Sequence, residues 1–235
     1  MSIRRLVETL SRNRVVKRRL PQDLGGGTFY ASPDAALRYW LPWGEYDPLL
    51  IDVARKLVKP GMTVWDVGAN VGLFSFAAAH LSRTQVLAIE PDPFLAHLIT
   101  RTANPYVSVL AAAVSDKIGI AHLHIAKRGR ASNFVGNGRG EAGGERCTQS
   151  VPTVTLDSLL QDFPAPDLVK IDIEGMEHVA LRGAMALLKR RPVLFAEVAE
   201  QNRLPMERML SGYRFLFTNM QPAPHVPFNL IAVPN

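Results

Sequence analysis

The chain has 235 residues, 47% of them hydrophobic, and a single cysteine, Cys147. This length suits one α/β domain with a large core and is short for two ordinary domains joined by a linker. One cysteine excludes an internal disulfide and a cysteine-rich zinc site. The formal net charge is +6, but residues 1–20 hold seven Arg or Lys and one Glu, so residues 21–235 are neutral overall. The high isoelectric point belongs to an N-terminal tail and gives no indication of a nucleic-acid-binding surface.

The tail carries the first expected element. Ile3, Leu6, Val7 and Leu10 share one face of a basic amphipathic helix within residues 1–20. Such a helix would pack on this domain or on a second copy of it, bind an anionic membrane or a partner, or act as an organellar presequence. No stretch reaches the roughly 18 apolar residues of a membrane span, and no signal-peptide core follows the basic residues. We therefore expect a cytoplasmic protein.

After the tail, a glycine-rich joint at 24–28 precedes an expected short hairpin of Phe29–Tyr30 with Leu37–Leu41. The aromatic residues that follow, Trp40, Trp43 and Tyr46, would cap a cofactor pocket or pack in the core. We place a domain boundary near residue 45, with a basic helix and cap segment over 1–45 and the main domain over 46–235.

From Tyr46 onward, helical and strand patterns alternate. The expected order is helix to 58, strand 62–67, helix 72–82, strand 85–90, helix 93–103, strand 106–110, strand 118–125, strand 167–172, helix 176–190, strand 192–198, helix 203–211 and strands near 213–217 and 228–233. Such alternation predicts a parallel sheet with helices on both faces. Prolines in the last connection favour an antiparallel hairpin for the final two strands. Ligands of such sheets bind beyond the carboxyl ends of the strands.

The most specific pattern follows the first of these strands. Gly68 and Gly72 permit a tight turn into the next helix. Glu90 ends the second strand, 22 residues after Gly68, where a carboxylate can accept hydrogen bonds from both hydroxyls of a ribose. Asp66 or its neighbours would meet an amino group of the ligand, directly or through a water. The pattern predicts a nucleoside site.

The spacing of the glycines restricts the class of ligand that this loop can bind. A dinucleotide loop would read G-x-G-x-x-G and a Walker loop would contain G-K-S/T, and this loop has neither. No lysine or arginine lies between Lys59 and Arg83 to neutralise a triphosphate. A nucleoside without phosphates is favoured, and S-adenosylmethionine fits.

The chain from Trp43 onward resembles the FkbM-type S-adenosylmethionine-dependent methyltransferases, over about four fifths of its length. The matching segments, in order, are 46–48, 59–61 with 64–72, 88–91, 112–116, 154–157, 170–177, 181–184 and 229–234. Asp47 departs from the family pattern, which has glutamate after the tyrosine. The resemblance implies a Rossmann-like seven-stranded class I methyltransferase sheet, S-adenosylmethionine as cofactor, and a hydroxyl of a sugar, glycan or natural product as acceptor. The predicted cofactor-binding residues are Asp66, Gly68, Asn70, Gly72, Glu90, Ala113 and Asp116.

A neutral hydroxyl is a poor nucleophile and needs a base to take its proton. Asp172 and Glu174 flank the end of the predicted strand 167–172, and Glu197 stands near the end of the next strand. We predict these three as catalytic residues, with Asp172 first and with His178 as a weaker candidate base. The three carboxylates would also suit Mg²⁺, but no motif requires a metal and we predict none.

Residues 127–146 are rich in glycine and arginine, which predicts a long mobile loop, either a substrate lid or a solvated insertion. The expected contacts are Ser132 and Asn133, with Arg128, Arg130 and Arg139 available for an anionic acceptor. Three other functions stay open: an N-methyltransferase of a small molecule or peptide, which needs no base, a non-enzymatic scaffold, and an NAD-dependent oxidoreductase, disfavoured by the missing glycine. A homo-oligomer is also possible.

Overall fold

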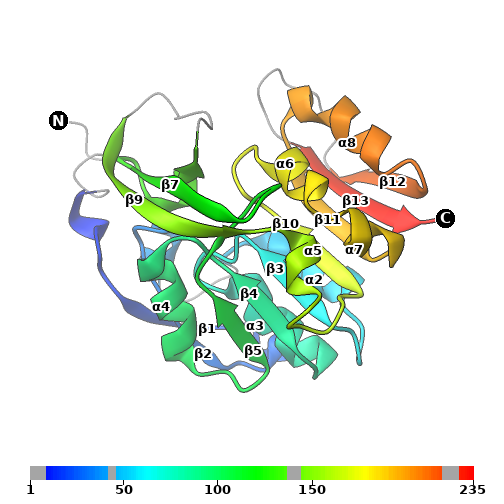
Figure 1. Cartoon of the computed structure of the whole chain (residues 1–235). Coiled ribbons are helices and arrows are strands. Elements are labelled where there is room, and N and C mark those ends of the chain that lie inside the picture. The colour runs from blue at the N-terminus through cyan, green and yellow to red at the C-terminus, as the bar shows by residue number, and fades with distance from the viewer. Residues whose placement is uncertain (1–8, 42–45, 137–143, 219–227) are drawn as a thin grey trace.

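The computed structural model describes residues 9–41, 46–136, 144–218 and 228–235 (Figure 1). Its centre is a seven-stranded sheet with the strand order β12-β13-β11-β10-β3-β4-β5. The strands are β3 (Val64–Val67), β4 (Val86–Ile89), β5 (Val107–Leu110), β10 (Leu168–Ile171), β11 (Val193–Val198), β12 (Tyr213–Thr218) and β13 (Phe228–Pro234). The pairs from β11 to β5 are parallel, and β13 is antiparallel to both of its neighbours. This confirms the predicted Rossmann-like sheet with an antiparallel C-terminal hairpin.

Helices cover the two faces of the sheet with separate hydrophobic cores. One core contains side chains of α2 (Pro48–Leu57), α3 (Leu73–Ser82) and α4 (Pro93–Thr102), and the other contains those of α5 (Leu156–Leu159), α6 (Glu177–Arg182), α7 (Met185–Lys189) and α8 (Arg203–Met209). The helix predicted over 176–190 is interrupted at Gly183. A Cβ at this position would lie 2.5 Å from the backbone oxygen of Ser115. The two backbone segments are therefore too close for any side chain at residue 183.

Local capping starts the helices beside the site. Asp92 accepts a hydrogen bond from the Phe94 amide (2.9 Å), with Pro93 at the first helical position, as predicted. Asp47, the residue at which the chain departs from the family pattern, caps α2 through the Leu50 amide (3.2 Å). A shorter carboxylate at this position therefore has a structural use at the start of the helix.

The N-terminal segment forms a different hairpin from the predicted one. β1 (Val16–Arg19) pairs with β2 (Thr28–Ala31) in antiparallel fashion, and residues 37–40 form the 3₁₀ helix η2 (Leu37–Trp40). Gly25 and Gly26 have φ of 92° and 59°, which lets the chain reverse between the two strands. The predicted basic helix falls mainly on residues 1–8, which lie outside the described residues; residues 9–11 are helical, and the chain is extended from Val16 onward.

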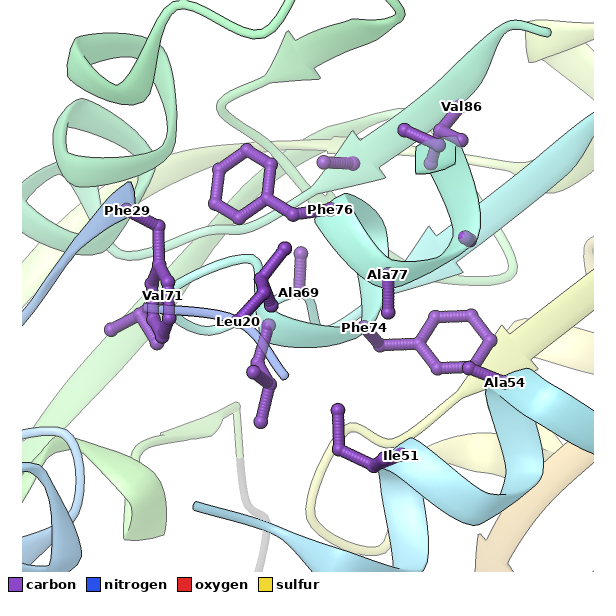
Figure 2. Packing of buried hydrophobic residues seen from close by; sticks show 14 of the residues in the cluster. Leu20, Phe29, Ile51, Ala54, Ala69, Val71, Phe74, Phe76, Ala77 and Val86 are labelled. Carbon is purple, nitrogen blue, oxygen red and sulfur yellow. The ribbon is translucent and has the colours of Figure 1, made fainter. Parts of the chain in front are cut away.

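The hairpin packs into the core of the main domain. Figure 2 shows Leu20 and Phe29 among side chains of α2 and α3, including Ile51, Phe74 and Phe76. The Phe29 ring lies 6.0 Å from the rings of both Tyr46 and Phe76, measured between centroids. Residues 20–31 thus bury apolar area together with residues of the domain 46–235.

A second, four-stranded sheet has the strand order β6-β9-β7-β8. It consists of β6 (Ala113–Val114), β7 (Gly119–Ala126), β8 (Phe134–Val135) and β9 (Glu145–Val154), with η3 (Arg130–Ser132) between β7 and β8. The predicted strand 118–125 is confirmed. The loop predicted over 127–146 is wrong for residues 130–132, 134–135 and 145–146, which belong to helices or strands, while 137–143 lie outside the described residues. In the described ranges, no helix is long and apolar enough to cross a membrane.

Candidate active site

A cavity lies at the carboxyl ends of β3, β4, β10 and β11. One side is formed by Gly68, Asn70 and Glu90, and another by Asp172, Glu174 and Glu197. Other parts of the lining come from the N-terminal segment around Arg38 and from residues beside the second sheet, which include the predicted contact Asn133 but not the predicted contact Ser132. The strand ends and Ala113 therefore bring seven of the ten predicted site residues to one cavity.

Close packing requires glycine at positions 68 and 72 of the loop after β3. Gly68 has φ of 77°, and a Cβ added to it would lie 1.9 Å from the backbone oxygen of Asp172. Gly72, the N-cap of α3, has φ of 81°, and its Cβ would meet the Phe76 ring at 2.9 Å. No side chain fits at either position without displacement, so the loop from β3 lies directly against the loop from β10.

Asn70 and Glu90 form the polar part of the cofactor side. Asn70 adopts a left-handed conformation (φ 54°), and its amide donates a 2.8 Å hydrogen bond to Glu90 Oε2. Glu90 Oε1 accepts from the Asp92 amide at 2.9 Å. Burial raises the pKa of the Glu90 carboxyl to about 8. Asn70 Oδ1 is buried and has no hydrogen-bond partner among the described residues, so the cavity wall holds an acceptor that a ligand donor would satisfy.

Lys170 lies beneath this loop, in the middle of the buried strand β10. Its Nζ is 3.0 Å from Asp66 Oδ1, 3.0 Å from the Gly68 oxygen and 3.6 Å from Asp172 Oδ2. Burial alone lowers the pKa of Lys170, but the carboxylates of Asp66 and Asp172 outweigh burial and raise that pKa above its ordinary value. The side chain is 2% exposed. A permanent positive charge thus joins the cofactor loop to the acidic side of the cavity.

Asp66 is fully buried behind the cavity and does not line it. Its Oδ2 accepts a 2.6 Å hydrogen bond from the Ser75 hydroxyl, and its Oδ1 faces Lys170. This geometry has Asp66 hold Lys170 and α3 in place. Its predicted contact with the cofactor's amino group stays a prediction.

Asp172 and Glu197 form a carboxyl pair on the acidic side. Both line the cavity, and burial together with the negative charge of Asp172 raises the pKa of Glu197 to about 7. The Glu197 carboxyl therefore carries a proton for part of the time near neutral pH, and the Lys170 ammonium lies 3.6 Å from Asp172 Oδ2 on the other side of the pair.

The turn after Asp172 is held by a buried acid that the sequence analysis missed. Glu177 is 1% exposed, and its Oε1 accepts hydrogen bonds from the amides of Ile173 (3.1 Å) and Gly175 (3.0 Å). Glu174 and Gly175 both have positive φ, 55° and 91°, so the chain leaves the strand sharply there. Burial raises the pKa of Glu177 to about 7. Two sequence features could have identified the residues that were missed. Glu177 belongs to the segment 170–177 that resembles the family, and Lys170 is a charged residue within an otherwise apolar strand.

An ion network fixes the wall formed by residues 130–135. The Asp34 side chain is 1% exposed and accepts from Arg146 at 2.6 and 2.9 Å and from Arg130 at 3.1 Å. Asp92 forms a short ion pair with Arg130. The Asp92 carboxylate also accepts a 2.8 Å hydrogen bond from Asn133 Nδ2. Arg130 is thus bound by two carboxylates, so the prediction of Arg130 as a contact for an anionic acceptor conflicts with its surroundings. Arg139 lies outside the described residues.

Some predicted site residues lie elsewhere. Ala113 lines the cavity, but Asp116 does not, and its carboxylate pairs with Arg182 Nη2 at 2.7 Å. His178 also lies away from the cavity lining, and burial lowers its pKa. Across the described residues, no three His, Cys, Asp or Glu side chains are arranged to hold a metal ion.

The fold matches that of known methyltransferases. The FkbM methyltransferase structure from Methylobacillus flagellatus superposes with a TM-score of 0.50 at 15% identity, covering 77% of this chain and 50% of that one. The M. jannaschii TYW2 structure, a complex with AdoMet, superposes with a TM-score of 0.50 at 16% identity, covering 88% of this chain and 81% of that one. The fold is therefore that of the class I S-adenosylmethionine-dependent methyltransferases, as predicted.

Residues 66–217 match the family described as "Methyltransferase FkbM domain". This range is well over half of the chain, which therefore belongs to the FkbM methyltransferase family, as the resemblance indicated. The hexuronic acid methyltransferase AglP of Haloferax volcanii is 24% identical over 152 residues, which are 63% of this chain and 61% of that protein. The chain spans about three fifths of the length of this curated relative. S-adenosylmethionine is the methyl donor of the family, which agrees with the predicted cofactor.

Proposed function

We propose that the protein transfers the methyl group of S-adenosylmethionine to a hydroxyl of a sugar, glycan or natural product. The observation that carries this proposal is the Asp172–Glu197 carboxyl pair, which faces the same cavity as the glycine loop and Glu90. A hydroxyl acceptor needs a base and an amine acceptor does not. A carboxyl pair with one negative charge, held beside the cofactor loop, supplies that base.

Three groups of the chain fit the cofactor. Glu90 has one amide donor on each carboxylate oxygen and keeps a lone pair on each for the ribose hydroxyls. The buried Oδ1 of Asn70 is an acceptor for an ammonium or hydroxyl donor. Gly68 keeps the loop free of side chains at the point nearest Asp172. When bound, the cofactor supplies an electrophilic methyl carbon on a positively charged sulfur.

On the acceptor side, the ionised carboxylate of Asp172 accepts the proton of the attacking hydroxyl. With the cofactor bound, the acceptor oxygen would take the methyl group from the sulfonium, and the carboxyl pair of Asp172 and Glu197 would take the hydroxyl proton. Lys170 holds Asp172 in its charged form before the transfer, at 3.6 Å. The turn held by Glu177 fixes the direction of Asp172, which contributes the alignment that a displacement requires.

The charges around the cavity favour an acceptor rich in neutral hydroxyls. Three cations line the described part of the cavity, and each faces a carboxylate: Arg38 pairs with Asp47 at 2.7 Å, Arg130 with Asp34 and Asp92, and Lys170 with Asp66 and Asp172. An anionic acceptor would therefore be repelled by the Asp172–Glu197 pair, and each cation of the described lining already has a carboxylate partner. The relative AglP, a hexuronic acid methyltransferase, supports a carbohydrate acceptor but not its neutrality, because a hexuronic acid carries a carboxylate.

The test begins with calorimetric titration of the full chain with S-adenosylmethionine, S-adenosylhomocysteine and NAD. We expect the first two to bind and NAD not to bind. Methyl transfer from labelled S-adenosylmethionine is then screened over neutral glycosides, hexuronic acids and amino sugars. In Asp172→Asn we expect turnover to fall by about 10²–10⁴, with cofactor affinity within about threefold. Cofactor binding with full activity in Asp172→Asn would favour an amine acceptor, and no cofactor binding would favour a scaffold.

A further inference from the structure

The ion network beside the second sheet extends to the carboxylate on the cofactor side of the cavity. Arg130 lies between the side chains of Asp34 and Asp92, which are 1% and 0% exposed. Its Nε donates to Asp34 Oδ2 at 3.1 Å, and its Nη1 pairs with Asp92 Oδ2. The Asp92 amide donates to Glu90 Oε1 at 2.9 Å, and the Asn70 amide donates to Glu90 Oε2 at 2.8 Å. A continuous series of bonded groups therefore connects Arg130 to the loop after β3.

Arg130 compensates the charge of Asp92. The Asp92 carboxylate also accepts hydrogen bonds from a backbone amide and from a side-chain amide, but both of these donors are neutral. Burial raises the pKa of Glu90, the negative charge of Asp92 adds to this rise, and the charge of Lys170 opposes it. Without Arg130, a buried negative charge beside Glu90 would lack its counter-ion, and the protonated form of Glu90 would be favoured.

Arg146 belongs to the same network but has different contacts. The side chains of Arg130 and Arg146 are similarly buried, at 10% and 14% exposure. Arg146 donates to both oxygens of Asp34, at 2.6 and 2.9 Å, and its Nε donates to the Ala126 oxygen at 2.7 Å. Among the contacts of the described residues, Arg130 is bonded to Asp92 and Arg146 is not. The two arginines therefore share one partner, and they differ in their connection to Glu90.

We propose that Arg130 is a positioning residue for cofactor binding, which acts through Asp92 to keep Glu90 charged and oriented toward the ribose hydroxyls of S-adenosylmethionine. Arg130 fixes the Asp92 side chain, and the Asp92 amide fixes one oxygen of Glu90. Asp34 holds Arg130 from the opposite side, so the N-terminal segment contributes to the cofactor side of the cavity. The inference rests on the role proposed above for Glu90 and is independent of the acceptor.

The experiment measures the affinity of the full chain for S-adenosylmethionine by calorimetry over a range of pH. In Arg130→Met we expect the Kd near neutral pH to rise about tenfold, the size of a typical coupling within one hydrogen-bond network. The pH below which affinity falls should also move upward, because Glu90 would hold its proton more tightly. Arg130→Lys keeps the charge and should stay within about threefold of the wild type. Arg146→Met is the matched control, since it also removes an arginine from Asp34 but leaves Asp92 paired.

A second variant tests the proposal even where Arg130→Met does not fold. Asp92→Asn keeps an oxygen that can cap α4 and accept from Arg130, but it removes the negative charge beside Glu90, so the fall in affinity should move to lower pH. An unchanged pH dependence in Asp92→Asn would overturn the proposal.

Equal changes of Kd in Arg130→Met and Arg146→Met would also overturn it, because the network would then serve only to hold the fold together. Glu90→Gln separates this failure from that of the proposed function. If Glu90→Gln binds S-adenosylmethionine as the wild type does, the ribose contact is wrong and the role of Arg130 is wrong with it. If Glu90→Gln weakens binding and Arg130→Met does not, only the role of Arg130 is overturned.

Discussion

The two sides of the cavity are built by different physical means. The cofactor side, after β3 and β4, consists mainly of backbone held by glycines and of one carboxylate, Glu90. The acceptor side, after β10 and β11, consists of charged side chains around one buried ammonium, Lys170. Changes at the glycines of the cofactor side should therefore act through steric fit, and Glu90, whose pKa is raised to about 8, is the lining group on that side that responds to pH. Changes on the acceptor side should act through charge and be strongly dependent on pH.

The largest effect is expected at Lys170, where the two sides meet. Lys170→Met leaves the fully buried Asp66 without its counter-charge. We expect the free energy of unfolding to fall by about 3–5 kcal/mol, the cost of breaking a buried ion pair by removing one partner. Urea unfolding at neutral pH measures this change. Adding Asp66→Asn should recover part of the loss, and a double variant no more stable than the single one would contradict the charge explanation.

On the cofactor side, Gly68→Ala and Gly61→Ala form a matched pair. Both glycines have positive φ, 77° and 88°, but only Gly68 has backbone within 2 Å of an added Cβ, and nothing lies within 4 Å at Gly61. Gly61→Ala should cost about 1–2 kcal/mol of stability, from backbone strain alone. Gly68→Ala should cost more and should also weaken S-adenosylmethionine binding, by calorimetry, at least about tenfold. Equal effects of the two substitutions would exclude the close contact with Asp172 as the cause.

Ionisation of the carboxyl groups on the acceptor side should make the free energy of unfolding depend on pH. The pKa values of Glu177 and Glu197 are raised from 4.5 to about 7 in the folded protein. The folded state therefore binds more protons than the unfolded state between these values, so stability is greatest below about pH 4.5 for these two groups and is lost as pH rises through 7. Glu177→Gln should flatten this fall by up to about 3 kcal/mol. Thermal unfolding measured from pH 5 to pH 8 in the wild type and the variant tests it, and parallel curves would contradict the shift.

The sequence predicts the part of this structure that depends on local pattern. The apolar runs at β3, β4 and β10, the glycines at 68 and 72, and the acids at strand ends could all be located, because periodicity and turn chemistry are encoded over a few residues. Parallel strands then bring their carboxyl ends to one edge without further information. For this reason Gly68, Glu90 and Asp172 were found together with the fold.

What the sequence did not predict depends on partners distant along the chain. Lys170 is recognisable as part of the site only once β10 is known to pair in register with β3, opposite Asp66. Arg130 and Arg146 meet Asp34 across 96 and 112 residues, and no local pattern indicates that pairing. The hairpin of β1 with β2 was missed because the glycines at 25 and 26 were interpreted as a joint when they form the turn.

The smallest expected effect sharpens the border of the cofactor side. Asp116 was predicted to bind the cofactor, but its carboxylate pairs with Arg182 on the surface, where the two side chains are 32% and 52% exposed. Asp116→Ala should therefore cost less than about 1 kcal/mol of stability, as for exposed ion pairs, and should leave S-adenosylmethionine affinity within about twofold. Glu90→Gln serves as the reference, since it changes a lining carboxylate of the same cavity. A loss of affinity in Asp116→Ala as large as that in Glu90→Gln would extend the cofactor side beyond the cavity, to the start of the second sheet.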